Sequence, residues 1–293
     1  MPEDRRYPIQ PFDPALITDF LSERSVVSSL FLSGGKCSSN YKLLLSTGET
    51  FVLRLRSRGD AARESYVMDL VRDLVPVPVE VDRGDGWSVY LFVEGHRLSD
   101  DPELVGKAAE ALARISSVRF PSGGWINPGG TITPFDFGDG RDFTTAMLGR
   151  EDVRGYLGEA TVEVVREITR SGAESPDPDD ATPCLCHGDF NPTNIIVKDG
   201  EVSGILDWEF AHAGSRYMDI GNLLRNTDPK RHVLIERGLE AGGVHLPHDW
   251  KRRARLIDLS SHLEFLTTAR ADDFKQSCVL WIRDFVAEYG SGA

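Results

Sequence analysis

The residues best suited to chemistry lie between Cys184 and Glu209, in the stretch CLCHGDFNPTNIIVKDGEVSGILDWE. A polar cluster containing Asp189 and Asn194 separates two short apolar runs, and a third apolar run ends at another carboxylate, Asp207. Carboxylate and amide oxygens are the ligands that Mg²⁺ takes from proteins. A carboxylate left free of metal can accept a proton from a hydroxyl nucleophile. The three side chains therefore predict phosphoryl transfer, with Asp189 as the base and the other two as magnesium ligands.

A predicted β-hairpin brings these residues together. The pair Asp199-Gly200 between two apolar runs is a strong signal for a two-residue turn. Counting outward from that turn places Asn194 opposite Ile205, and a bulge at Gly204 would shift this register by one. In either register Asn194 and Asp207 leave the hairpin at the same end, where the preceding polar cluster enters.

Two other interpretations of this stretch remain open at this point. Asp189 and Asn191 can form an ordinary Asx turn that Asn194 caps. Cys184, Cys186 and the following histidine can suggest a zinc site, but no second ligand pair is visible. Alternation along an apolar strand favours buried, free cysteines.

The same stretch resembles a known family. His187 to Asn194 (HGDFNPTN), followed by Ile205 to Glu209 (ILDWE), is similar to the catalytic core of the aminoglycoside phosphotransferase and choline kinase family. It is also similar to the H-R-D-x-x-x-x-N and D-F-G elements of protein kinases. The resemblance implies that Asp189 is the catalytic base, that His187 braces the catalytic loop, and that Asn194 and Asp207 bind Mg²⁺. Asp219 resembles a later structural aspartate of the family.

The resemblance also implies a fold and a nucleotide site. The fold is α+β and bilobal, as in protein kinases, with an N-terminal antiparallel sheet lobe containing one helix and a larger, mainly helical C-terminal lobe. Arg54 takes the place of the strand lysine of kinases, and Glu64 matches the helix glutamate that pairs with it. The other residues implied to bind nucleotide are Gly34, Gly35, Ser38 and Asn40 in the phosphate-covering loop, and Phe92, Val93 and Glu94 in the hinge. A plain hairpin turn is the alternative for the loop.

The remaining sequence pattern agrees with two lobes. Residues 1–94 are rich in predicted strands, with one helix that Asp60 caps and Pro76 ends, and residues 95–293 are mainly helical. We predict helices over 102–116, 161–170, 247–268 and 272–289. The Gly-, Pro- and aromatic-rich segment 119–142 is predicted to be either a substrate wall or lid, or an ordered structural spur.

Composition limits the classes of partner and compartment. The chain has 293 residues and a formal net charge of −13, which argues against a nucleic-acid or anionic-membrane binder. The N-terminus lacks an apolar signal segment, and no apolar run is long enough to span a bilayer. The four cysteines show no disulfide framework. We therefore expect a cytoplasmic enzyme.

The predicted activity is transfer of the γ-phosphoryl group of ATP, or of GTP, to a hydroxyl group of a small molecule. The negative net charge of the chain favours an amine-bearing acceptor, such as an aminoglycoside-like antibiotic. Acidic residues in and after the segment 119–142 and beside Asp207 point the same way: Asp136, Asp139, Asp142, Glu151, Asp152 and Glu209. The alternatives are a kinase of a small metabolite (choline, ethanolamine, homoserine or a sugar) and a nucleotide-binding pseudoenzyme, which Arg54 keeps open. A protein kinase is disfavoured because the helix signal at Met218 follows Asp207 too closely for an activation segment.

Overall fold

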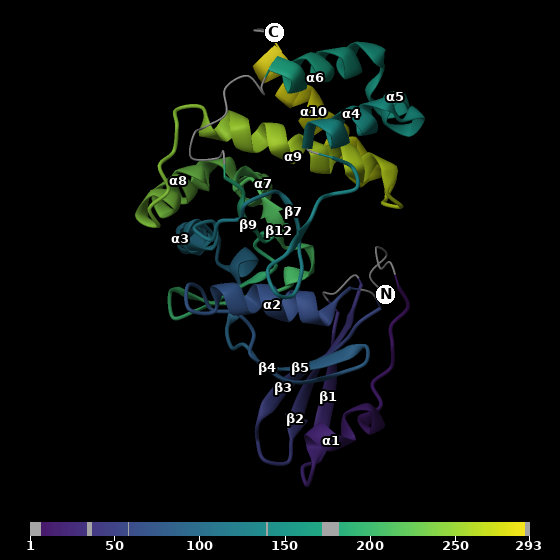
Figure 1. Ribbon diagram of the computed structural model, residues 1–293, viewed down its shortest axis with the longest axis vertical. Coiled ribbons are helices and arrows are strands. Elements are labelled where there is room, and N and C mark those ends of the chain that lie inside the picture. Colours follow the sequence, from purple (N-terminus) through teal and green to yellow (C-terminus); the bar gives the residue numbers. More distant parts are fainter. Residues whose placement is uncertain (1–6, 34–36, 58, 139, 172–181, 291–293) are drawn as a thin grey trace.

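A five-stranded antiparallel sheet forms the N-terminal part of the protein. The computed structural model describes residues 7–33, 37–57, 59–138, 140–171 and 182–290. The sheet has the strand order β1-β2-β3-β5-β4. Its strands are β1 (Val26–Leu32), β2 (Ser39–Leu45), β3 (Thr50–Leu55), β4 (Glu80–Gly84) and β5 (Trp87–Leu91). Helix α2 (Ala61–Val71) lies between this sheet and the rest of the chain (Figure 1).

Alternation along the central strands sets the two faces of the sheet. Leu43 and Leu53 are fully buried in a cluster with Ile17 and Phe20 from the N-terminal turns η1 (Pro14–Ile17) and α1 (Thr18–Leu21). Arg54 lies between buried leucines of β3 and therefore faces α2. The sheet and its one long helix agree with the expected N-terminal lobe, whereas the short α1 and β4 were not predicted.

The predicted start of α2 is confirmed. The Asp60 side chain accepts hydrogen bonds from the backbone nitrogens of Ala62, at 2.9 Å, and Arg63, at 3.2 Å. Such a cap satisfies amide groups that have no partner within the helix. It also fixes the point from which Glu64 projects.

Beyond Gly95 the chain is mainly helical. The helices are α3 (Val105–Ile115), α4 (Gly140–Gly149), α5 (Glu151–Leu157), α6 (Glu159–Ser171), α7 (Tyr217–Arg225), α8 (His232–Ala241), α9 (Trp250–Thr267) and α10 (Asp272–Tyr289). Two small sheets have the orders β11-β10-β6 and β8-β7-β12-β9. Their strands are β6 (His96–Arg97), β7 (Gly124–Ile126), β8 (Ile132–Thr133), β9 (Cys184–Cys186), β10 (Ile195–Lys198), β11 (Glu201–Ile205) and β12 (His212–Gly214). Short 3₁₀ turns complete this part: η2 (Leu98–Asp100), η3 (Pro102–Leu104), η5 (Trp208–Phe210) and η6 (Pro229–Arg231).

Four predicted helices match α3, α6, α9 and α10 closely, but α4, α5 and α8 were missed. The predicted loop 119–142 contains the β7–β8 hairpin, which pairs with β12. Gly124 adopts φ 142° in β7, and a Cβ there would lie 2.3 Å from the Thr133 carbonyl oxygen, so only glycine fits. Residues 124–133 therefore extend a sheet, and a role of the segment as a substrate wall or lid stays a prediction.

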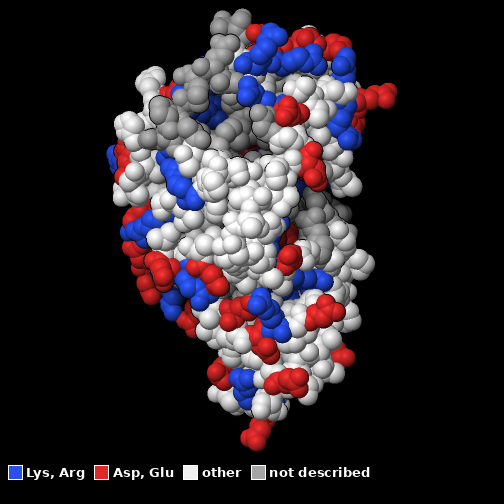
Figure 2. All heavy atoms as spheres, in the orientation of Figure 1, with Lys and Arg blue, Asp and Glu red and all other residues white. Residues whose placement is uncertain are grey.

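The end of the molecule opposite the N-terminal sheet is a group of packed helices. Helix α9 contacts α4, α5, α7 and α10, and α6 lies beside α10 (Figure 1). Acidic and basic side chains are interspersed over the face that Figure 2 shows. Among the described residues, no helix is long and apolar enough to cross a bilayer.

A buried histidine in this helical group gives a prediction on stability. His262 of α9 stacks on Trp281 of α10, with ring centroids 3.8 Å apart, and Asp258, Arg225 and Arg255 face it. Burial lowers the pKa of His262, although Asp258 opposes this shift. Because the folded-state pKa lies below the unfolded value, the stabilisation is complete above about pH 6.5 and is lost as the pH falls through the folded pKa.

We expect His262→Phe to keep the stacking but to remove this proton uptake on unfolding. The difference in melting temperature between pH 7 and pH 5 should shrink relative to the wild type, with each pKa unit removed worth about 1.4 kcal/mol. Thermal unfolding at both pH values measures this change. An equal difference in both proteins would contradict the role given to His262.

Candidate active site

The hairpin that carries Asn194 and Asp207 is present, with the shifted register. Lys198 faces Glu201 across the turn, and Ile195 faces Ile205. Ser203 is the extra residue, because Val197 pairs with Val202 while the next pair is Ile196 with Gly204. The unbulged count that placed Asn194 opposite Ile205 is therefore wrong by one residue. The Leu206 nitrogen instead donates to the Asn194 carbonyl oxygen at 2.8 Å. Asp207, the next residue, therefore leaves the hairpin beside the Asn194 backbone.

Two amide groups hold the Asp189 carboxylate. Asn191 donates through Nδ2 to Oδ1 at 2.9 Å, and Asn194 donates through Nδ2 to Oδ2 at 2.9 Å. The Asn191 Oδ1 atom also accepts from the Thr193 backbone nitrogen at 2.9 Å, so an Asx turn is present as well. The Asn191 side chain therefore forms the turn through its oxygen and orients Asp189 through its nitrogen.

His187 and Asp219 stabilise the backbone of the loop that carries Asp189. The buried Asp219 carboxylate accepts from the backbone nitrogens of His187, at 2.6 Å, and Gly188, at 2.9 Å. The His187 ring accepts from the Asp189 nitrogen at Nδ1 (3.2 Å), and its Nε2 lies 2.9 Å from the Leu206 carbonyl, which assigns the Nε2–H tautomer. His187 therefore contacts both chain segments of the site through their backbones.

Gly188 allows this brace to form. It adopts φ 81°, and a Cβ at this position would lie 2.4 Å from the Phe210 carbonyl oxygen. The backbone of the loop can therefore approach the segment after Asp207 only because residue 188 has no side chain.

Asp207 lies in a left-handed conformation, with φ 67° and ψ 62°, directly before the buried Trp208. This conformation is uncommon for residues other than glycine and often marks functional positions. The Asp207 Oδ1 atom accepts a hydrogen bond from Arg54 Nη2 at 2.8 Å. The strand arginine and the second carboxylate of the hairpin, far apart in the sequence, are therefore in direct contact.

Arg54 lies among three carboxylates. Besides Asp207, its guanidinium contacts Glu64 Oε1 at 2.9 Å and Glu209 Oε2 at 3.5 Å. Burial by itself would lower the pKa of Arg54, but Glu64 and Asp207 outweigh it and hold that pKa above its ordinary value. Arg54 is thus charged, and it pairs with Glu64 as the resemblance implied.

The phosphate-loop residues can be placed only in part. Gly34 and Gly35 lie outside the described residues. Ser38 is buried, and its hydroxyl oxygen accepts from Arg54 Nε at 3.2 Å. Asn40 pairs across the β2–β3 ladder with Arg54. Both residues therefore lie next to the arginine expected to meet the phosphates.

The expected hinge joins the N-terminal sheet to the helical part. The Phe92 nitrogen donates to the Thr50 carbonyl at 3.2 Å, and the Glu94 carbonyl accepts from Ser203 Oγ at 2.9 Å. A Cβ on Gly204 would lie 2.6 Å from Val93 Cγ1, so β11 approaches the hinge closely. The hinge residues thus lie beside the hairpin that carries the site.

Sequence reasoning missed two arginines near the site. Arg56 donates to Glu64 Oε2 at 3.0 Å, and its position two residues after Arg54 on a strand was the available signal. Arg63 donates to the carbonyl oxygens of Glu209, at 2.9 Å, and Ala211, at 3.0 Å. Arg63 therefore ties α2 to the segment after Asp207.

The residues expected to bind magnesium have suitable oxygen atoms. Asn194 uses its amide nitrogen to hold Asp189, and no hydrogen bond reaches its amide oxygen from the described residues. Asp207 is 37% exposed and contacts Arg54 through Oδ1, so among the described residues its Oδ2 atom is left for a metal ion. No group of three or more His, Cys, Asp or Glu side chains suited to a metal exists among the described residues. Two oxygen ligands fit a Mg²⁺ ion that takes its other ligands from phosphate and water.

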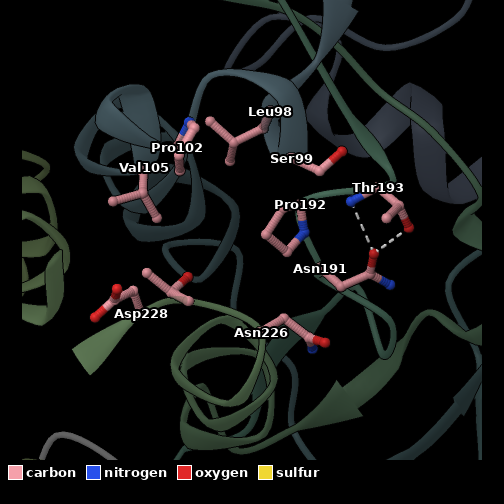
Figure 3. Close-up of a pocket in the computed structure, with 10 residues that line it drawn as sticks. Leu98, Ser99, Pro102, Val105, Asn191, Pro192, Thr193, Asn226 and Asp228 are labelled. Atoms are coloured by element: carbon pink, nitrogen blue, oxygen red, sulfur yellow. Dashed lines mark hydrogen bonds between the residues drawn. The ribbon is translucent and has the colours of Figure 1, made fainter. Parts of the chain in front are cut away.

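A pocket of about 180 Å³ lies against the loop that follows Asp189. Asn191, Pro192 and Thr193 form one wall, and Figure 3 shows Leu98, Pro102 and Val105 on one side with Asn226 and Asp228 opposite. The remaining lining residues are Ser99 and Thr227, and the Thr227 hydroxyl is buried without a partner among the described residues. Asn191 lines the pocket and also donates to the Asp189 carboxylate, so the pocket is separated from the expected base by the Asn191 side chain.

The acidic residues expected to favour an amine are partly neutralised. Asp152 pairs with Arg150 at 2.8 Å, and this hydrogen bond lowers the pKa of Asp152. Glu209 contacts Arg54. Asp136 and Asp142 are exposed and Glu151 begins α5, while Asp139 lies outside the described residues.

Comparison with known proteins identifies the fold. The fold is similar to that of macrolide 2'-phosphotransferase from Brachybacterium faecium, with a TM-score of 0.64, 14% identity, and 93% of this chain and 98% of that chain covered. It is similar to a fructosamine-3-kinase described as putative from Thermobifida fusca, with a TM-score of 0.67, 19% identity, and 93% and 98% covered. A third similar structure is an aminoglycoside phosphotransferase mutant in a ternary complex with AMP-PNP and hygromycin B, with a TM-score of 0.69, 18% identity, and 96% and 99% covered.

These similarities confirm the expected α+β, protein-kinase-like fold. Among curated proteins, no sequence matches the chain. At the level of families, residues 30–256 match the phosphotransferase enzyme family, a span that includes both the nucleotide-side residues and the hairpin. The chain therefore belongs to the phosphotransferase enzyme family and is an enzyme of that class.

Proposed function

We propose that the protein transfers the γ-phosphoryl group of ATP to a hydroxyl group of a small, amine-bearing molecule. The observation that carries this proposal is the Asp189 carboxylate, held at both oxygens by Asn191 and Asn194. This carboxylate lies on the loop that packs against the Asp207 segment through His187. One oriented carboxylate beside a second acidic residue is what phosphoryl transfer to a hydroxyl requires.

The chemistry of this chain's residues follows from that geometry. Asp189 orients the acceptor hydroxyl and takes its proton as the new oxygen–phosphorus bond forms. In the same step the bond between the γ-phosphorus and the bridging oxygen breaks, and a nucleoside diphosphate leaves with that oxygen. Asn194 and Asp207 would hold Mg²⁺, which when bound neutralises charge on the phosphates. Arg54 supplies a fixed positive charge on the nucleotide side.

The nucleotide part of the proposal draws on two observations. The similar aminoglycoside phosphotransferase was solved with AMP-PNP, an ATP analogue. In this chain Arg54 and Ser38 lie between the expected phosphate loop and Asp207. GTP is the alternative donor, since a hinge that reads the base through its backbone leaves no side chain to distinguish the two.

We place the boundary between the nucleotide lobe, 1–94, and the acceptor lobe, 95–293, at this hinge, because β6 directly after it pairs with β10.

The acceptor part of the proposal uses the pocket beside Asn191. Its volume suits one ring of a larger molecule, and the polar residues Asn191, Asn226 and Asp228 line it. Asp228 at the rim is 46% exposed and can attract an amine, although Arg231 lies 3.7 Å away. The ring would enter the pocket while its reacting hydroxyl lies beside Asp189.

A direct assay tests the function. Purified protein with Mg²⁺ and ATP is combined with a panel of aminoglycosides, macrolides, amino alcohols and sugars, and products are identified by mass spectrometry. We expect one class to gain 80 Da and to raise the melting temperature by mass action. Nucleotide binding without transfer to any acceptor in a broad panel would favour the pseudoenzyme instead.

Filling the pocket should weaken binding of the acceptor alone. Ser99 lines the pocket and is exposed, and its backbone nitrogen donates to the Pro192 carbonyl at 3.3 Å. We expect Ser99→Trp to raise the KM for the acceptor roughly 10-fold or more, since a lost ring contact is worth about 1–3 kcal/mol. The KM for ATP should stay unchanged, and Ser277→Trp on exposed α10 is the matched control. An unchanged acceptor KM would remove the pocket from the acceptor site.

A further inference from the structure

Glu64 has two arginine partners, one for each carboxylate oxygen. Arg54 donates to Oε1 at 2.9 Å and Arg56 donates to Oε2 at 3.0 Å. The side chains of Glu64 and Arg56 are only 4% and 5% exposed. Arg54 lies in β3 and Arg56 directly follows the end of that strand, and both reach Glu64 of α2. The expected single pair of a basic strand residue and a helix glutamate is here a triad.

The two arginines differ in their other contacts. Arg56 donates to Ser88 Oγ and to the Tyr90 hydroxyl, both at 2.7 Å, and both residues belong to β5 of the same sheet. These partners are neutral, and a bound nucleotide would not compete for them. Arg56 therefore links three parts of the N-terminal lobe, β3, β5 and α2.

Arg54 instead faces the site. Its remaining contacts are Ser38 beside the expected phosphate loop and the carboxylates of Asp207 and Glu209, which follow β11. If Arg54 serves the phosphates, it must exchange at least its bond to Asp207 for them. A single guanidinium has too few donors, in too rigid a fork, to keep every one of these partners.

This exchange would be costly if it drew Arg54 away from Glu64 and Glu64 had no other cation. A buried carboxylate that loses its only cation is strongly destabilised, and α2 would have to move to solvate it. The bond from Arg56 to Oε2 removes that penalty, because Glu64 keeps a charged partner whatever Arg54 does.

We propose that Arg56 is the positioning residue that holds Glu64 and helix α2, so that Arg54 can exchange Asp207 for the nucleotide phosphates without displacing that helix. The proposal rests on the proposed nucleotide-dependent function. It divides between two arginines what the family resemblance assigned to one.

Arg56→Met and Arg56→Lys test this proposal, each measured alone and with Glu64→Gln. We expect Arg56→Met to raise the KM for Mg·ATP about 10-fold and to lower kcat. Arg56→Lys should recover part of the loss, because an ammonium can reach Glu64 but cannot also bind Ser88 and Tyr90 as the fork does. In the Glu64→Gln background, Arg56→Met should have little further effect on kcat/KM, since the two residues act as a unit.

Controls separate positioning from general stability. Arg72→Met removes an exposed arginine at the end of the same helix, where it pairs with Asp69, and should leave both constants unchanged. A purely structural Arg56 would lower the melting temperature and the active fraction but would leave the KM for Mg·ATP unchanged, and this result would overturn the proposal. Additive effects of Arg56→Met and Glu64→Gln would overturn it too.

If Arg56→Met does not fold, Arg56→Lys and Tyr90→Phe carry the same test, because the second removes a partner of Arg56 without touching Glu64. A milder rise in the KM for Mg·ATP supports the proposal, and wild-type constants in both variants overturn it. Failure of the proposed function is distinguishable, because the wild type itself would then transfer no phosphate to any acceptor, whether or not it bound Mg·ATP.

Discussion

Asp189→Asn is expected to fold normally and to lose turnover by roughly 10³-fold, within the range usual for removal of a general base. The carboxylate is the only part of Asp189 that can take a proton, and an amide of the same shape cannot. One of the two bonds from Asn191 and Asn194 would also be lost, because an amide has one oxygen. Binding of Mg·ATP should weaken far less than turnover, since Asp207 and Arg54 are not partners in these contacts.

The measurement is kcat with the acceptor that the panel identifies, together with Mg·ATP affinity by calorimetry and the melting temperature. Asp284→Asn, at an exposed carboxylate on α10, is the control and should behave as the wild type. Asp189→Ala should lose as much turnover as Asp189→Asn. Turnover near that of the wild type in either Asp189 variant would remove this residue from the role of base.

The contact between Asp189 and Asn194, and the place where the Asp207 segment leaves β11, were predictable because one local hairpin joins these segments. The Asp199-Gly200 turn fixed which residues leave the ladder together, and the error of one residue came from the bulge at Ser203. Bulges depend on packing against a neighbouring segment, here the hinge, and a single strand pattern does not show that neighbour.

The contacts of Arg54 were only half predictable. Its pairing with Glu64 joins residues 10 positions apart, and the resemblance implied it. Its bond to Asp207 spans 153 positions, so no local pattern contains it. Arg56 was missed for a related reason, because alternation shows which face a residue occupies but not which buried carboxylate it meets there.

The long amphipathic helices were predicted well, and the short elements were not. Helix α6 has one apolar stripe through Val162, Val165 and Ile168, which burial against α9 and α10 explains. Strand β4 follows two prolines and exposes Val81, so its sequence resembles a loop. Such elements form because neighbouring strands pair with them, and their own propensity contributes little.

Asp207→Asn is expected to abolish magnesium-dependent nucleotide binding while leaving the fold intact. Asparagine tolerates the left-handed conformation at φ 67°, whereas alanine would add strain of about 1–2 kcal/mol. The substitution removes a negative charge beside Arg54, but Glu64 and Glu209 still face that guanidinium. Turnover should fall roughly 10³-fold, because charge neutralisation by the metal is worth several kcal/mol and each 1.36 kcal/mol is tenfold in rate.

Asp199→Asn is the matched control for this last variant. Asp199 also adopts a positive φ, of 52°, and the resulting Asn-Gly pair suits a two-residue turn. Calorimetry with ATP, with and without Mg²⁺, should show that Asp199→Asn keeps the magnesium dependence and Asp207→Asn loses it. If Asp207→Asn bound Mg·ATP as tightly as the wild type, the metal would have to sit elsewhere. The ion pair with Arg54 would then be a structural link between the lobes, with no part in holding the nucleotide.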